Sequence, residues 1–209
     1  MINILIADDH PIVRRGLREI IDNESDMQVV AEAKNGFEVF NLVKKTKIDL
    51  AMLDISMPDR SGLDVMKQLR KEYPALPVLV LSVHSEEQYA LRVLKGGGSG
   101  YLTKESAPNE LVKAIRKVIS GGKYVSSSFA EKLIFEIEKQ EKPLHKTLSD
   151  REFEVLCKIA TGKTVKEIAN EMYLSVKTVS TYRSRILEKM DMTSSAQLTY
   201  YAIKNGLVE

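Results

Sequence analysis

Acidic residues follow two apolar segments in the first half of the chain. The stretch AMLDISMPDR, residues 51–60, carries an apolar run into Asp54, and the run INILIA leads into Asp8 and Asp9. Apolar runs without polar alternation are typical of strands buried on both faces of a parallel sheet. The carboxyl ends of such strands share one edge, where α/β proteins bind ligands. We therefore expect the three carboxylates to converge at that edge.

Three converging carboxylates would raise one another's pKa unless a cation lay among them. Oxygen ligands with room for water suit Mg²⁺. Two later segments bring further groups to the same edge, because PVLVLS ends in the hydroxyl of Ser82 and GYLTK ends in the ammonium of Lys104. Together these groups predict a site for a phosphoryl group on Asp54, with Mg²⁺ and Lys104 neutralising its oxygens and Ser82 donating to one of them.

The elements that must position these groups alternate between strand and helix. Strands are expected at 2–7, 27–33, 48–54, 77–83 and 100–103, and amphipathic helices at 11–22, 36–46, 62–72, 86–95 and 108–120. Five such repeats predict an α/β domain over residues 1–120, with a doubly wound, five-stranded parallel sheet.

After residue 120 the strand pattern stops. Residues 121–147 have the composition of a linker, with one helix expected near 129–140 that starts at a capping box of Ser128 and Glu131. Residues 148–209 form a small all-α domain, in which four short helices start at Ser149, Thr164, Ser175 and either Ser194 or Ser195. The short turn between the second and third of these helices has the spacing of a helix-turn-helix.

The third of these helices carries an excess of positive charge. Lys177, Arg183, Arg185 and Lys189 stand against Glu188 alone, and hydroxyl side chains and Tyr182 are interleaved with them. Three apolar residues recur at helical spacing and should face the core, which leaves the polar residues outward; they are Val179, Ile186 and Met190. The second helix of a helix-turn-helix enters the major groove, so this segment is expected to be the recognition helix.

The order of the motifs, DD, then D followed by MP, then S, then K, resembles the receiver domain of two-component response regulators, which is flavodoxin-like. The second half resembles the LuxR-type DNA-binding domain, and together they resemble the NarL/FixJ family across essentially the whole chain. The resemblance implies that Asp54 accepts phosphate from a sensor histidine kinase. It further implies roles for six neighbours: Asp9 and the Ser56 carbonyl bind Mg²⁺ with Asp54, Asp8 acts largely through water, Ser82 and Tyr101 are the switch pair, and Lys104 contacts the phosphate.

The resemblance also assigns DNA contacts. It places three hydroxyl residues toward base edges, namely Ser180, Thr181 and Ser184, and four others mainly at phosphates, namely Lys177, Thr178, Arg183 and Arg185. Tyr182 is expected to contact DNA as well, with no particular contact assigned. The helix equivalent to AQLTYYAIKN pairs two DNA-binding domains in that family, so a homodimer on double-stranded DNA is expected after phosphorylation. Phosphorylation could act by favouring the dimer or by releasing the DNA-binding domain from the receiver, and the sequence does not choose between the two.

The composition argues against a membrane protein, an internal disulfide and a histidine metal site. The apolar runs are far shorter than the roughly 20 residues of a membrane helix, so no membrane partner and a cytoplasmic location are expected. The single cysteine, Cys157, excludes an internal disulfide, and the three histidines show no metal-ligand spacing.

In the segment KGGGSG, Gly96 and Gly98 lower helix propensity, so a loosened switch region is expected.

Two other functions fit parts of the pattern. An aspartyl-phosphate phosphohydrolase would use Asp54 as nucleophile, but it needs a second acid to protonate the leaving group, and Ile55 and Ser56 follow Asp54. A phosphorylation-independent DNA or RNA binder would keep only a vestigial receiver. The complete set of acids, hydroxyl and lysine argues against that alternative.

Overall fold

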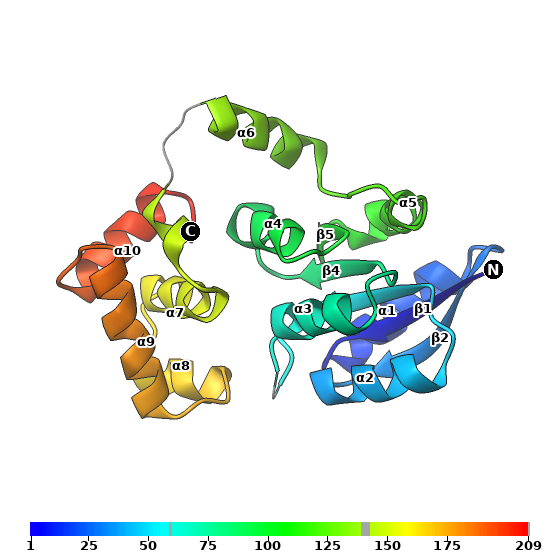
Figure 1. The fold of residues 1–209 in the computed structure, drawn as a ribbon, viewed down its shortest axis with the longest axis horizontal. Coiled ribbons are helices and arrows are strands. Elements are labelled where there is room, and N and C mark those ends of the chain that lie inside the picture. The colour runs from blue at the N-terminus through cyan, green and yellow to red at the C-terminus, as the bar shows by residue number, and fades with distance from the viewer. Residues whose placement is uncertain (59, 139–142, 209) are drawn as a thin grey trace. The chain divides into compact units, whose positions relative to one another are not determined.

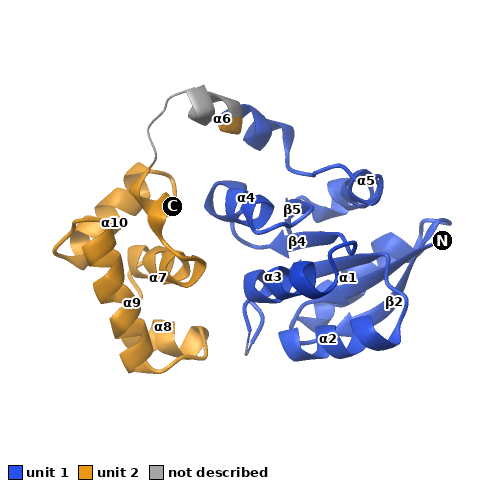
Figure 2. Ribbon diagram, in the orientation of Figure 1, with its two compact units in different colours: residues 1–132 blue, residues 133–209 orange. Residues whose placement is uncertain are grey.

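In the computed structural model, the described residues are 1–58, 60–138 and 143–208, with the backbone alone described at 134–138. The chain divides into two compact units, residues 1–132 and 133–209 (Figure 2). Among the described residues, no helix combines the length and the apolar character needed to cross a membrane.

Unit 1 is built on a five-stranded sheet in which every neighbouring pair is parallel. The strands are β1 (Ile2–Ala7), β2 (Met27–Ala33), β3 (Leu50–Asp54), β4 (Val78–Ser82) and β5 (Gly100–Thr103), in the order β2-β1-β3-β4-β5. All residues of β3 and β4 are buried, because helices cover both faces of the sheet. This burial accounts for their unbroken apolar sequences and confirms the predicted fold.

The helices of unit 1 alternate with its strands (Figure 1). They are α1 (Pro11–Asp22), α2 (Gly36–Lys45), α3 (Gly62–Glu72), α4 (Glu86–Lys95) and α5 (Ala107–Ile119). Helix α1 contacts α5, and α2 contacts α3. One apolar core lies between the sheet and the α1 and α5 helices, and it includes Ile4, Ile21, Met52, Leu111 and Ile115.

Two glycines at the end of α4 allow close packing against α3. A Cβ atom on Gly98 would lie 2.4 Å from Val93 Cγ1 and 2.8 Å from Met66 Sδ, and one on Gly96 would lie 2.8 Å from Met66 Cε. Real side chains essentially never approach so closely. The glycines that we expected to loosen this region therefore let the carboxyl end of α4 pack tightly.

From residue 143 to 208, the structure describes the short 3-10 helix η1 (Leu144–Thr147) and the α-helices α7 (Asp150–Ala160), α8 (Val165–Glu171), α9 (Val176–Lys189) and α10 (Ser195–Lys204). The side chains of Ser149, Thr164 and Ser175 cap α7, α8 and α9, as predicted, and Ser194 caps α10. Tyr173 has a φ of 55°, in the left-handed region, where the chain turns from α8 into α9. These elements confirm the helix-turn-helix.

Helix α6 (Ser127–Glu138) starts differently from the sequence prediction. Its first turn is capped by Ser126, whose Oγ accepts the main-chain N–H of Phe129 at 3.1 Å. The predicted capping box of Ser128 and Glu131 is therefore wrong. The N–H of Ser126 donates instead to the Glu86 carboxylate of α4 at 2.8 Å.

A buried acidic site and a candidate DNA-binding helix

The carboxyl edge of the sheet gathers the residues predicted for a phosphoryl site. Asp8 follows β1, Asp54 ends β3 and Ser82 ends β4, and all three are buried. Lys104 follows β5, and its side chain is 12% exposed. The parallel register thus brings two carboxylates, a hydroxyl and an ammonium into one buried group, as the sequence predicted.

Lys104 joins the two buried carboxylates. Its Nζ lies 2.6 Å from Asp8 Oδ2 and 3.0 Å from Asp54 Oδ2, and its main-chain N–H donates to the carbonyl of Ser82 at 2.8 Å. The other oxygen of Asp54, Oδ1, is buried and has no hydrogen-bond partner within the described residues. A buried carboxylate oxygen without a partner is costly, and a bound cation or a bond to a phosphoryl group would remove that cost.

Burial and the neighbouring charges both shift the pKa values of Asp54 and Lys104. Burial raises the pKa of the Asp54 carboxyl, the Lys104 ammonium opposes the rise, and the Asp8 carboxylate adds to it, so that the net shift is upward. Burial lowers the pKa of Lys104, but the two carboxylates raise it by more, and its pKa lies above its usual range. Lys104 is therefore a fixed positive charge beside Asp54.

A hard cation fits the acid cluster. One ligand atom from each of Asp8, Asp9, His10 and Asp54 lies within 4.8 Å of the others. Together with the unpaired Asp54 oxygen, this oxygen-rich set has the chemistry that Mg²⁺ prefers. The exposed residue Ser56 follows two positions after Asp54, and a role for its carbonyl stays a prediction.

His10 is a member of this cluster that the sequence analysis set aside. Its Nδ1 lies 2.8 Å from Asp9 Oδ1 and 3.2 Å from Asp8 Oδ1. The spacing of the three histidines did not indicate a metal site, and His10 joins this cluster through its contacts with the acids. The available signal was its place directly after Asp9, since a residue adjacent to a strand-end acid remains near the same edge.

Gly62 keeps the backbone around Asp54 in place. Its N–H donates to the carbonyl of Ile55 at 2.9 Å, and a Cβ atom at this position would lie 1.9 Å from the carbonyl oxygen of Asp54. Any side chain at position 62 would push the Asp54 backbone aside. The amino end of α3 can approach the acidic residue this closely because position 62 is glycine.

The predicted switch pair holds one peptide segment from two sides. Ser82 Oγ accepts the N–H of His84 at 3.1 Å, and the hydroxyl of Tyr101 donates to the carbonyl of His84 at 2.8 Å. Ser82 and Tyr101 are fully buried, and burial raises the pKa of the Tyr101 phenol, which keeps it protonated as a donor. A movement of either side chain would thus act on the backbone of His84.

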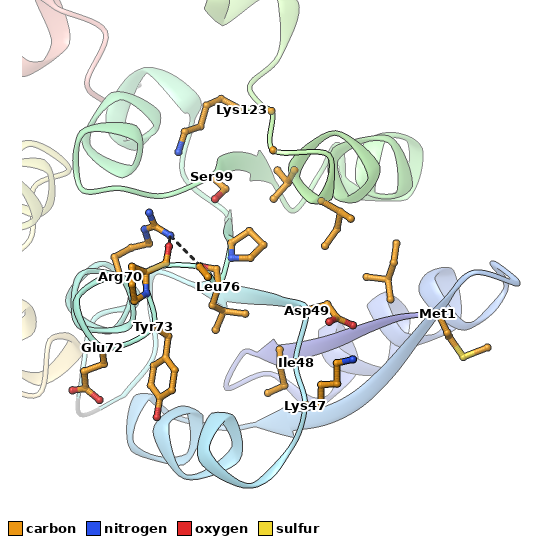
Figure 3. A pocket seen from close by; sticks show the side chains of 18 residues that line it. Met1, Lys47, Ile48, Asp49, Arg70, Glu72, Tyr73, Leu76, Ser99 and Lys123 are labelled. Carbon is orange, nitrogen blue, oxygen red and sulfur yellow. Dashed lines mark hydrogen bonds between the residues drawn. The ribbon is translucent and has the colours of Figure 1, made fainter.

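A separate cavity of about 1040 Å³ opens at the amino ends of the strands (Figure 3). Arg70 and Lys123 enter it, but they donate to main-chain carbonyls, Arg70 to Leu76 at 3.4 Å and Lys123 to Gly98 at 2.6 Å. Basic groups commonly satisfy carbonyls at helix ends in this way. None of the four residues in the acid cluster lines this cavity.

In unit 2, helix α9 presents the polar face predicted for DNA recognition. Val179, Ile186 and Met190 are buried, which confirms the expected core stripe. The predicted contact residues lie outside that stripe: Lys177, Ser180, Thr181, Ser184 and Arg185 are exposed, and Thr178, Tyr182 and Arg183 are half-buried. All eight are therefore on the solvent side of the helix or at its margin.

Several of these side chains already make local hydrogen bonds. The hydroxyl of Thr181 donates to the Lys177 carbonyl at 3.0 Å, and that of Ser184 donates to the Ser180 carbonyl at 3.1 Å. Bonds of this kind use the hydroxyl proton and leave the oxygen as an acceptor. Arg183 Nε donates to Ser195 Oγ at 2.9 Å, which ties α9 to the start of α10.

Glu152 fixes the other end of α9. This buried carboxylate accepts the N–H of Ser149 at 2.8 Å and the Nζ of Lys189 at 2.6 Å. Lys189, which we counted among the outward cations, is thus bound to the first turn of α7. The same carboxylate completes the α7 cap and positions the carboxyl end of α9.

Replacing Glu152 with Gln is expected to lower the free energy of unfolding of unit 2 by about 1–2 kcal/mol, because charged hydrogen bonds become neutral ones. Burial raises the pKa of Glu152, but Lys189 and Ser149 lower it by more, so the folded-state pKa lies below its usual value. The stabilisation is therefore present at neutral pH and lost as the pH falls through that folded-state pKa. Urea unfolding at several pH values measures both effects.

The matched control is Glu167→Gln, which changes the exposed capping box of α8. A smaller loss is expected there, because water compensates the missing charge. Equal losses in the two variants would contradict the positioning role of Glu152.

Two sequence profiles match the chain. The response regulator receiver domain matches residues 4–116, and the family described as bacterial regulatory proteins, luxR family, matches residues 146–202. The first match falls on the sheet and the acid cluster, and the second falls on α7 to α10.

Named relatives and solved structures match the chain over nearly its whole length. Response regulator UvrY of Escherichia coli strain K12 is 36% identical over 210 residues, which is 99% of this chain and 96% of UvrY. RcsB from Salmonella enterica serovar Typhimurium, solved bound to promoter rprA with the phosphomimetic BeF3⁻, has a TM-score of 0.68 at 28% identity and covers 96% of this chain and 98% of its own. A structure of two RcsB dimers bound to two parallel DNAs has a TM-score of 0.62 at 29% identity, covering 97% of this chain and 98% of that one.

Proposed function

The chain belongs to the NarL/FixJ family of two-component response regulators, and on that premise we propose that phosphorylation of Asp54 controls sequence-specific DNA binding through α9. The family acts in transcriptional regulation and not as metabolic enzymes. The observation that carries the assignment to Asp54 is its buried carboxylate, with Lys104 on one oxygen and, among the residues that the structure describes, no hydrogen-bond partner on the other.

The chemistry is transfer of a phosphoryl group from a phosphohistidine of a sensor histidine kinase. An oxygen of Asp54 forms a bond to phosphorus as the P–N bond breaks, and the bonding electrons remain on the histidine nitrogen, which takes up a proton. Lys104 neutralises charge on the new phosphoryl oxygens, and Ser82 donates a hydrogen bond to one of them. Asp8, Asp9, Asp54 and the Ser56 carbonyl would hold Mg²⁺, with Asp8 acting largely through water, and the ion would supply further positive charge at the site.

The response passes through the switch pair. Rotation of Ser82 toward the phosphoryl group withdraws its oxygen from the His84 N–H, and Tyr101 repacks with the segment that its hydroxyl contacts. A ligand shifts a conformational equilibrium only by its preference for one state. Here that preference comes from the new bond of Ser82 and the altered contacts of Tyr101.

The output is DNA binding by a homodimer. Two copies would place two α9 helices on the half-sites of an operator. Helix α10 offers apolar surface for pairing, because Tyr200 and Ile203 are exposed. The structure of RcsB dimers bound to DNA supports DNA binding as a dimer. A regulator that reads chromosomal DNA is expected to work in the cytoplasm.

Incubation of the full chain with acetyl phosphate and Mg²⁺ separates this function from the two alternatives. Slow, stoichiometric labelling supports a switch that hydrolyses its own aspartyl phosphate slowly. Rapid turnover would indicate a phosphohydrolase, and no labelling would indicate a vestigial receiver. Intact-mass measurement over time, with released phosphate assayed in parallel, distinguishes the three results.

The lifetime of the phosphoryl group is expected to depend on Ser56 and His84, because each lies two residues past a site residue and should flank the path of the attacking water. The double variant Ser56→Ala with His84→Ala should change the dephosphorylation rate several-fold. Loss of acid-labile phosphate after removal of acetyl phosphate measures that rate. Ser120→Ala, at an exposed serine on the far end of α5, serves as control, and an unchanged lifetime in the double variant would contradict the assignment.

A further inference from the structure

The first turn of α4 follows directly after the peptide segment that the switch pair holds. His84 is bonded through its N–H to Ser82 and through its carbonyl to Tyr101, and α4 begins two residues later at Glu86. The N-cap residue, Ser85, makes no side-chain capping bond. The carboxyl end of α4, by contrast, is close-packed around Gly98. The amino end of α4 thus has no side-chain cap of its own and follows the switch segment directly, so a displacement of His84 acts first on this end of the helix.

The carboxylate of Glu86 caps α6 from a distance of 40 positions in the sequence. Its Oε1 accepts the N–H of Ser126 at 2.8 Å, and its Oε2 accepts the Ser126 hydroxyl. The Ser126 oxygen in turn accepts the N–H of Phe129. In an ordinary capping box, a Glu or Gln three residues after the cap accepts the N–H of the cap residue. In α6 the residue three positions after the cap is Phe129, whose side chain cannot accept a hydrogen bond of this kind. Glu86 of α4 accepts the N–H of Ser126 instead.

The chain just before Ser126 is fixed to the sheet. Tyr124 accepts the N–H of Tyr101 at 2.9 Å and donates its own N–H to Ser99 at 3.0 Å, which extends the hydrogen bonding of β5. The side chain of Tyr124 is buried. Tyr124 thus anchors this part of the chain to β5. Ser126, two residues further on, is bonded to Glu86 of α4.

A cavity of about 440 Å³ lies beside this cap, lined by Glu86, Leu102, Ser106, Glu110 and Ser126 among others. Close-packed interiors resist movement, whereas open space beside a helix end permits it. The first turn of α4 can shift here without displacing the core. Besides the bonds of Glu86 to Ser126, an ion pair of Lys132 with Glu87 also joins α6 to α4. Its side chains are 61% and 39% exposed, and exposed ion pairs contribute little to stability.

We infer that Glu86 is a positioning residue that couples the phosphorylation site to the start of α6. Its carboxylate completes the α6 cap while Ser82 and Tyr101 hold His84 as described. A displacement of that segment moves Glu86 away from Ser126 and loosens the first turn of α6, which leads to unit 2. The inference rests on the proposed function, because phosphorylation of Asp54 supplies the displacement.

Hydrogen exchange on the full chain with Mg²⁺, with and without beryllofluoride as the phosphate mimic, tests this coupling. Exchange should change several-fold in two segments, residues 83–90 at the switch and residues 124–132 at the α6 cap. In Glu86→Ala and in Ser126→Ala, the response at 83–90 should persist while that at 124–132 is lost. Glu87→Ala, which removes the neighbouring surface contact, should keep both responses.

The possible exchange results distinguish the role of Glu86, the coupling to α6 and the switch itself. A response at 124–132 that survives in both cap variants would overturn the role of Glu86, as would an equal loss in Glu87→Ala. A wild-type response at 83–90 without one at 124–132 would overturn the coupling and leave the switch standing. Absence of a response at both segments in the wild type would count against the proposed function itself.

Discussion

Replacing Asp54 with Asn is expected to abolish phosphorylation by acetyl phosphate while leaving the fold intact. The amide of Asn is a poor nucleophile and carries no charge, so it neither attacks phosphorus nor attracts Mg²⁺. The variant should fold, because Asn has nearly the same shape and Lys104 keeps its ion pair with Asp8 at 2.6 Å. Intact-mass measurement of the labelled protein gives the stoichiometry, and circular dichroism checks the fold.

Asp49→Asn is the matched control for this experiment. Asp49 is a partly buried carboxylate of the same unit, where it accepts the N–H of Asn3 at 2.8 Å, and its variant should label as the wild type does. Chelation of Mg²⁺ with EDTA should suppress labelling of the wild type as completely as the Asp54→Asn substitution does, because the acids need a cation before another anion can join them. Stoichiometric acid-labile phosphate on Asp54→Asn would contradict the assignment.

Substitutions in α9 are expected to weaken DNA binding in two different ways. Lys177→Ala removes an exposed cation and should weaken specific and non-specific binding alike, with a reduction of the salt slope by about one unit. Arg183→Ala should do the same and also lose the bond to Ser195. Ser180→Ala and Thr181→Ala should cost roughly 1–3 kcal/mol at the cognate site only, with little change in salt slope. This contrast separates residues that position the helix from residues that read sequence.

Titrations of a selected operator and a scrambled duplex at several salt concentrations measure this contrast. Lys204→Ala, at an exposed lysine near the end of α10, controls for a general loss of positive charge. If all four α9 variants lost the same affinity on both duplexes, this helix would not be the sequence reader.

The sheet and the core of the acidic site could be predicted because both follow from local pattern and strand direction. Unbroken apolar runs identify buried parallel strands, and a parallel sheet forces their carboxyl ends to one edge. Asp8, Asp54, Ser82 and Lys104 therefore had to lie near one another once the strands were located. The N-caps of α7, α8 and α9 were also predictable, because each capping interaction lies within four residues.

The features that could not be predicted from the sequence depend on contacts between residues far apart in the chain. The segment VSSSFAEK offers Ser128 with Glu131 as a local capping box, yet Ser126 caps α6 because Glu86 is at hand in space. Lys189 matches the cationic pattern of α9, but the buried Glu152 binds it. The packing roles of Gly96 and Gly98 likewise arise from Met66 on another helix. Each outcome is set by a tertiary partner that the local sequence does not specify.

The affinity of the full chain for a selected operator duplex, measured with Mg²⁺ in the presence and absence of beryllofluoride, tests most directly whether Asp54 controls DNA binding. Because the mimic occupies the phosphoryl position, it should tighten operator binding several-fold in the wild type and leave Asp54→Asn unchanged. Equal wild-type affinity in the two conditions, or the same gain in Asp54→Asn, would contradict control of DNA binding through Asp54.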